Sequence, residues 1–262
     1  MADLLPYQYL LIAVLFIWSG FVRSGLGFGG SVLSLPFLLL VVDDPLIFLP
    51  IIGVQLMIFS TLITWQNRKR VQNRATQFSE GIAVSTIDWH YLRYSLKVMI
   101  IPKLVGVLGL LTLPATLMSS VIYLIIIVYA FSYVMNRPFQ SNSKGLDMLF
   151  LIVGGYISGT SLIGAPLIVA VYASHVAKHQ LRDTLFVLWF ILVLIKLVSF
   201  IIAGVDLQLI HHLWLLPCAY LGHLIGEKAH HRLVEAENGT FYRVLGWVLV
   251  LVSSFGLMKA VI

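Results

Sequence analysis

Three basic side chains of this sequence, Arg23, Lys103 and Lys196, occur inside apolar stretches with no obvious acidic partner. A charged side chain at the centre of a bilayer costs about 2.5–3.5 kcal/mol on insertion scales, so retained charges of this kind usually have a function. Because all three are positive, we expect them to help bind an anion. Lys103 could instead reach the membrane surface or pair with a carbonyl freed by Pro102, and Arg23 could be a cytoplasmic anchor.

Two glycine-rich segments, 24–30 and 158–164, interrupt apolar stretches at corresponding places in the two halves of the chain. Glycines let backbone N–H groups approach an oxyanion, hydroxyl groups add donors, and the N-terminus of a helix carries a partial charge of about +0.5. We therefore expect both segments and the three cations to bind substrate. The candidate residues are Arg23, Ser24, Gly25, Gly27, Phe28, Gly29, Gly30, Ser31, Lys103, Ser158, Gly159, Thr160, Ser161, Gly164 and Lys196.

Breaks of this kind, in corresponding hydrophobic segments of two halves, indicate the substrate site of a secondary transporter. Non-helical backbone is tolerated at membrane depth only where it is buried in protein or lines a cavity. The sequence therefore predicts both a class of protein and the position of its site.

The composition excludes an ordinary soluble domain, because 60% of the 262 residues are hydrophobic and only 11% are charged. The single cysteine, Cys218, excludes an internal disulfide and gives no metal-binding pattern. The 25–30 segment formally fits a dinucleotide fingerprint, but no βαβ pattern surrounds it. We expect no cofactor, no metal and no nucleic-acid partner. The first apolar stretch, 4–18, is expected to be retained.

Apolar stretches of near-spanning length occur at residues 45–65, 94–112, 117–135, 184–204, 210–226 and 243–261. Two others, 7–42 and 147–178, are too long for one straight span, because more than 30 residues of helix would reach about 50 Å. Each contains a glycine break near its middle, with arms of roughly 10–16 residues. Each is either one broken span or a hairpin that returns to its starting side.

The basic residues favour the hairpin. Lys and Arg of short loops collect on the cytoplasmic side of membrane proteins. If both broken segments return, 13 of the 17 basic residues lie in cytoplasmic loops, and the outer loops hold Asp3, Asp43, Asp44 and Asp206. If both segments cross, several basic loops fall outside.

The predicted fold is therefore an all-α polytopic membrane protein of two inverted repeats, residues 1–140 and 141–262. Each repeat is a glycine-broken helical hairpin followed by three transmembrane helices. Whether the hairpin arms span fully stays open. The internal similarity agrees: Ser24, Gly25 and Gly30 match Ser158, Gly159 and Gly164, and a Pro-Gly-Gly pattern at 102, 106 and 109 recurs at 217, 222 and 226. Close helix packing is the simpler prediction for Gly106, Gly109, Gly222 and Gly226.

These motifs resemble the TauE/SafE sulfite exporter family, also called the toluene sulfonate uptake permeases. In the first half the resemblance rests on 25–30 (GLGFGG) with Pro36, and in the second half on Gly155, 158–159, Gly164, Pro166 and the 217–226 pattern. The 160–165 segment is poorer in glycine than is usual for the family. The resemblance implies a multi-pass protein of the bacterial inner (plasma) membrane that transports small sulfur-containing anions such as sulfite, thiosulfate or organosulfonates.

The function that we expect is a secondary carrier for a small sulfur oxyanion or sulfonate, working by alternating access in the lipid bilayer. Protons or the membrane potential are the default coupling, because no P-loop is present. The alternatives are a channel for anions or neutral solutes, or a carrier of another organic anion. An enzyme is not expected, because no paired catalytic constellation lies at membrane depth. We expect His175 and His223 to pack rather than relay protons. A homo-oligomer stays open.

Overall fold

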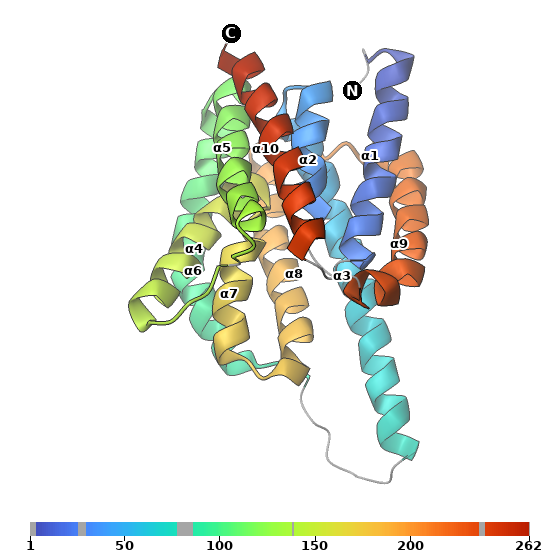
Figure 1. Ribbon diagram of the computed structural model, residues 1–262, viewed down its shortest axis with the longest axis vertical. Coiled ribbons are helices and arrows are strands. Elements are labelled where there is room, and N and C mark those ends of the chain that lie inside the picture. The colour runs from blue at the N-terminus through green and yellow to red at the C-terminus, as the bar shows by residue number, and fades with distance from the viewer. Residues whose placement is uncertain (1–3, 26–29, 78–85, 138, 236–238, 262) are drawn as a thin grey trace.

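The protein is seen in a computed structural model that describes residues 4–25, 30–77, 86–137, 139–235 and 239–261 (Figure 1). Every element within these ranges is helical. In chain order they are α1 (Pro6–Gly25), α2 (Gly30–Val41), α3 (Pro45–Gln77), α4 (Trp89–Thr112), α5 (Ala115–Val134), α6 (Lys144–Ser161), α7 (Ala165–His175), α8 (Lys178–Ile202), the short η1 (Leu209–His211), α9 (His212–Glu235) and α10 (Gly239–Val261).

The prediction of an all-α polytopic membrane protein is confirmed. Among the described residues, 7 helices are long and apolar enough to cross a membrane. Six of them correspond to the six predicted spans, and the seventh is α1, with 20 residues. Large apolar side chains such as Ile101, Leu108 and Leu251 are exposed on the outside of the bundle, where lipid would cover them.

Each long broken segment folds into two packed helices. α1 packs against α2, and α6 packs against α7. In Figure 1 the start of α1 and the end of α2 lie at the upper end of the molecule, whereas α7 ends at the lower end, where α8 begins. The first arms are longer than predicted, with 20 residues in α1 and 18 in α6, whereas α2 has 12 and α7 has 11.

The second break is shorter than the glycine-rich segment around it. Helix α6 continues through Ser158 and Gly159 to Ser161, and it ends where Leu162 adopts a left-handed conformation with φ of 60°. Only Leu162, Ile163 and Gly164 separate α6 from α7. Within this last turn the hydroxyl groups of Thr160 and Ser161 both donate to the Ile157 carbonyl.

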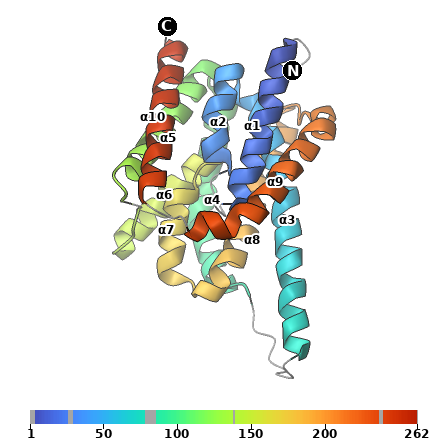
Figure 2. The same cartoon turned by 45° about the vertical axis from the view of Figure 1, so that its right-hand side comes forward.

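The hairpins are held by helices from the other half of the chain. Helix α1 packs most extensively against α9, and α6 packs most extensively against α4 (Figures 1 and 2). Glycines make both crossings close. A Cβ at Gly222 would lie 1.9 Å from the Ile17 carbonyl oxygen, and one at Gly106 would lie 2.3 Å from that of Tyr156. Such contacts leave no room for any side chain.

The close-packing prediction is thereby confirmed for three of its four glycines and wrong for the fourth. Gly226 lies against the Phe21 carbonyl oxygen, with 2.4 Å to an added Cβ, as Gly222 and Gly106 lie against their own partners. Gly109 has no atom within 4 Å of an added Cβ, because it lies on α4 beyond the crossing with α6.

Replacing Gly222 with alanine should destabilise the protein, because the methyl group would force α1 and α9 apart at the Ile17 carbonyl. Overpacking of this kind costs about 1–3 kcal/mol, and more when backbone must move. Gly109→Ala is the matched control, and it should leave stability unchanged or raise it by up to about 1 kcal/mol. The measurement is the apparent unfolding temperature of the two variants in detergent. Equal temperatures would contradict the packing argument.

Candidate functional site

Two buried lysines meet the end of α6 at the second break. Lys103 of α4 donates from Nζ to the Ser158 hydroxyl at 3.0 Å and to the Ser158 carbonyl at 3.3 Å. Lys196 of α8 donates from Nζ to the Gly159 carbonyl at 2.7 Å. The two amino groups therefore donate to successive peptide carbonyls, and both side chains are almost completely buried.

The end of α6 explains why cations are stable there. The last four carbonyl groups of a helix have no partner within the helix, and the C-terminus carries a partial negative charge of about −0.5. Lys196 supplies a partner for the Gly159 carbonyl, and Lys103 adds a second donor to the Ser158 carbonyl, which also accepts from the Leu162 N–H. The carbonyl that Lys103 binds is thus that of Ser158, not one freed by Pro102. No acidic side chain in the described part of the chain forms an ion pair with either lysine.

At the first break, Arg23 lies in the last turn of α1 and is 7% exposed. Its guanidinium carbon lies 4.8 Å from the centre of the Phe59 ring, on α3. All three guanidinium nitrogens are buried, and none has a hydrogen-bond partner among the described residues. A Cβ at Gly30, the first residue of α2, would lie 3.4 Å from Arg23 Nε, so the guanidinium adjoins the N-terminus of that helix. Burial rules out an exposed anchor.

The neighbouring Ser24 connects α1 to α9. Its hydroxyl forms a short hydrogen bond with Nδ1 of His223. The His223 ring lies 5.5 Å from that of Phe59, measured between ring centres, so Phe59 contacts both Arg23 and His223.

The two breaks meet through Ser31, in the first turn of α2. Its hydroxyl donates to the carbonyl of Leu162, the residue that ends α6, at 3.3 Å. The structure thus brings together Arg23, Ser24, Gly30 and Ser31 from the first half with Ser158, Gly159, Lys103 and Lys196 from the second break.

The remaining candidates have different surroundings. The hydroxyl groups of Thr160 and Ser161 both donate to the Ile157 carbonyl, at 3.0 Å each, so their protons are already used. Gly164 precedes α7 as its N-cap and lies against the Gly154 carbonyl. Gly25 is buried at the end of α1. Gly27, Phe28 and Gly29 lie outside the described residues.

Three residues of this region were not among the site residues predicted from the sequence. His223 was expected to pack, and its position three residues before Gly226, like that of Lys103 before Gly106, is the pattern that could have indicated its place. No sequence pattern indicated a role for Phe59. Gln55, also on α3, is fully buried, and neither amide atom has a partner among the described residues.

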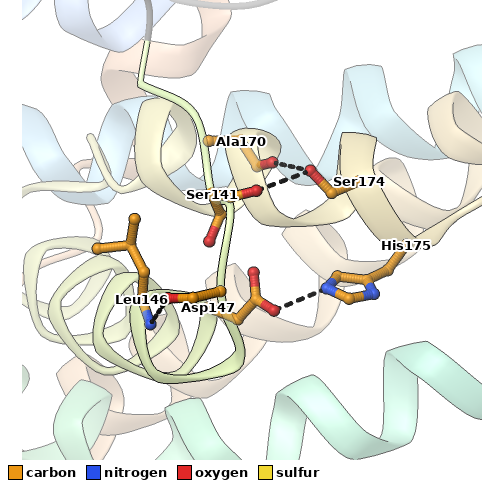
Figure 3. Close-up of polar contacts among 7 residues, drawn as sticks. Ser141, Leu146, Asp147, Ala170, Ser174 and His175 are labelled. Carbon is orange, nitrogen blue, oxygen red and sulfur yellow. Dashed lines mark hydrogen bonds and ion pairs between the residues drawn. The ribbon is translucent and has the colours of Figure 1, made fainter.

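A second polar cluster lies away from the breaks, where α6 begins and α7 ends (Figure 3). Nε2 of His175 lies 2.8 Å from Oδ2 of Asp147, and the Ser174 hydroxyl donates to the Ala170 and Ser141 carbonyls. The pair links the first turn of α6 to the last turn of α7 at the open end of the second hairpin. No group of three metal-binding side chains was found among the described residues.

The sequence profile of the family described as Sulfite exporter TauE/SafE matches residues 11–255. The match includes both hairpins and all the helices that carry the buried cations. Neither a curated protein nor a solved structure shows significant similarity to the chain.

Replacing Lys103 with methionine should lower stability, because the Ser158 hydroxyl would lose its buried partner and the Ser158 carbonyl would keep only the Leu162 N–H. A buried polar group left without a partner costs about 1–3 kcal/mol. Lys97→Met is the matched control, since Lys97 is an exposed lysine of the same helix and its loss should change stability by about 0.5 kcal/mol at most. The measurement is the apparent unfolding temperature in detergent. If both substitutions changed it by the same amount, the capping role of Lys103 would be contradicted.

Proposed function

We propose, because the chain belongs to the sulfite exporter TauE/SafE family, that it is a carrier that moves a small sulfur-containing anion across the membrane. The substrate class is sulfite, thiosulfate or an organosulfonate, bound where the two hairpins meet. The membership of the chain in a transporter family argues against an enzyme. The membrane concerned is the bacterial inner membrane.

Arg23 is the single observation that carries this proposal. A guanidinium group offers five N–H donors in a planar fork that suits the oxygens of an oxyanion. Burial of such a group without partners costs more than any neighbouring cation–π contact returns. An anion that accepts hydrogen bonds from these nitrogens would remove that cost.

The surrounding charges support the same substrate. Helix α2 begins at Gly30 beside Arg23, and α7 begins at Ala165 close to the Leu162 carbonyl that Ser31 contacts. Both N-termini favour negative charge. Lys103 and Lys196 are held by neutral oxygens only, so no carboxylate cancels a positive charge that either of them carries. Together they would attract an anion to the meeting point of the breaks.

We further propose that residues 1–140 and 141–262 form two inverted repeats. The pairing of helices supports this, because the first arm of each hairpin packs against the fourth helix of the other half: α1 against α9 and α6 against α4. The third helices of the two halves pair with each other, as do the last helices, α3 with α8 and α5 with α10. This pairing of helices between the two halves is what a two-fold axis in the membrane plane would produce. Inverted repeats of this kind support alternating access in secondary transporters.

A sulfur-containing anion should stabilise the wild-type protein and fail to stabilise an Arg23→Met variant. A ligand at about 100 times its Kd adds about 2.7 kcal/mol to the stability of the folded state. The measurement is the apparent unfolding temperature with sulfite, thiosulfate, ethanesulfonate, sulfate, phosphate and acetate. Arg93→Met is the control, because Arg93 is exposed on α4, and it should respond like the wild type. A response in the Arg23 variant equal to the wild type would contradict the assignment.

Carrier transport should also be saturable and show exchange. Proteoliposomes loaded with unlabelled substrate should accumulate the labelled anion transiently, because one site must alternate between the two sides. Empty vesicles without protein are the control. Flux that rises linearly with concentration, without exchange, would indicate a channel instead.

A further inference from the structure

The pairs Ser24–His223 and Ser158–Lys103 occupy equivalent junctions of the fold. In each, the serine lies in the last turn of a hairpin's first arm, α1 or α6, and its partner lies on the helix that crosses that arm, α9 or α4. The two serines align in the internal repeat of the sequence.

The partner side chains also occupy equivalent positions relative to a close-packed glycine of their helices. Lys103 precedes Gly106 by one helical turn, and His223 precedes Gly226 by the same distance along the chain. An added Cβ at Gly106 would lie 2.3 Å from the Tyr156 carbonyl oxygen of α6, and one at Gly226 would lie 2.4 Å from the Phe21 carbonyl oxygen of α1. One junction therefore holds a lysine where the other holds an imidazole.

This difference changes the chemistry, since histidine is the side chain that ordinarily changes its charge between pH 5 and pH 8. The Ser24 hydroxyl suits both states of His223. It can donate to Nδ1 of the neutral ring, and it can accept from Nδ1–H of the protonated ring. Protonation can therefore occur without loss of the bond between α1 and α9.

The position of His223 links its charge to that of Arg23. The Arg23 guanidinium and the His223 ring contact the same Phe59 ring, at 4.8 Å and 5.5 Å from its centre. Other titratable groups that face His223 are Tyr220, whose ring centre lies 6.0 Å away, and Glu227, both on α9 itself. While Arg23 is unpartnered, its charge opposes a proton on His223; an anion bound at Arg23 would remove that opposition.

We propose that His223 is the proton-binding site of the carrier, and that it takes a proton from solution when the anion binds at Arg23. The neutral imidazole becomes an imidazolium, so one proton accompanies the anion across the membrane and is released with it. Because linkage is reciprocal, the proton raises the affinity for the anion as much as the anion raises that for the proton. This inference rests on the proposed function, since it requires an anion at Arg23.

The test uses ethanesulfonate, a strong-acid anion whose own charge stays constant across the range of the experiment. Its Kd for the purified wild type should be lower at about pH 5 than at about pH 8, by a factor of roughly 5–150, the usual range of coupling between two sites. In His223→Asn the Kd should match the wild-type value at about pH 8 and stay constant with pH. Asparagine can still bond to Ser24. His175→Asn is the control and should keep the wild-type dependence.

A direct measurement avoids reliance on the variant's folding. Ethanesulfonate added to wild-type protein in weakly buffered solution near neutral pH should draw protons from the solution. Binding without proton uptake would overturn the proposal for His223 and leave the anion site standing, as would unchanged pH dependence in a folded His223→Asn. A wild type that binds no sulfur anion at either pH would instead overturn the proposed function, and this proposal with it.

Discussion

A helix that ends inside a membrane leaves carbonyl groups without partners, and the structure depends on how those of α6 are satisfied. Two lysines from different helices, Lys103 and Lys196, bind the carbonyls of Ser158 and Gly159. The arrangement offsets two costs at once, because the Gly159 carbonyl gains a buried partner and both lysine amino groups are buried with hydrogen bonds. It also explains why both lysines are tolerated in apolar helices, whether or not an anion is present.

The first hairpin solves the same problem differently. Its arm α1 ends with Arg23, whose guanidinium has no partner among the described residues, and with Ser24, whose hydroxyl bonds to His223. The lysines at the second break are therefore hydrogen-bonded to the chain, whereas Arg23 at the first break keeps its donors available to a ligand. If an anion binds where the breaks meet, Arg23 supplies its strongest direct contact, while Lys103 and Lys196 contribute mainly through their charge.

The sequence predicted the architecture better than the details of the site. Hydropathy and the distribution of Lys and Arg identified the six spans and the two hairpins, because both patterns follow from the cost of burying charge and backbone in lipid. The predicted first arms were shorter than the observed helices α1 and α6, because a glycine such as Gly159 can stay helical where another helix crosses it. Pairing across the fold, such as Arg23 with Phe59, leaves no periodic trace and depends on how the helices cross.

The glycine crossings restrict how a carrier of this fold could move. At the crossing of α1 with α9, and at that of α4 with α6, carbonyls and Cα atoms lie too close for any side chain to intervene. A movement that separated residues 1–140 from 141–262 as rigid units would break both crossings, because each joins the two halves. Sliding of one crossed pair past the other would leave both intact. Between the pairs, the hydrogen bond from Ser31 to Leu162 spans the two breaks at 3.3 Å, and a single bond of this kind contributes only about 1 kcal/mol. This hydrogen bond is therefore a weak restraint compared with the close packing at the crossings, and a carrier in which it breaks would open the place where we propose that the anion binds.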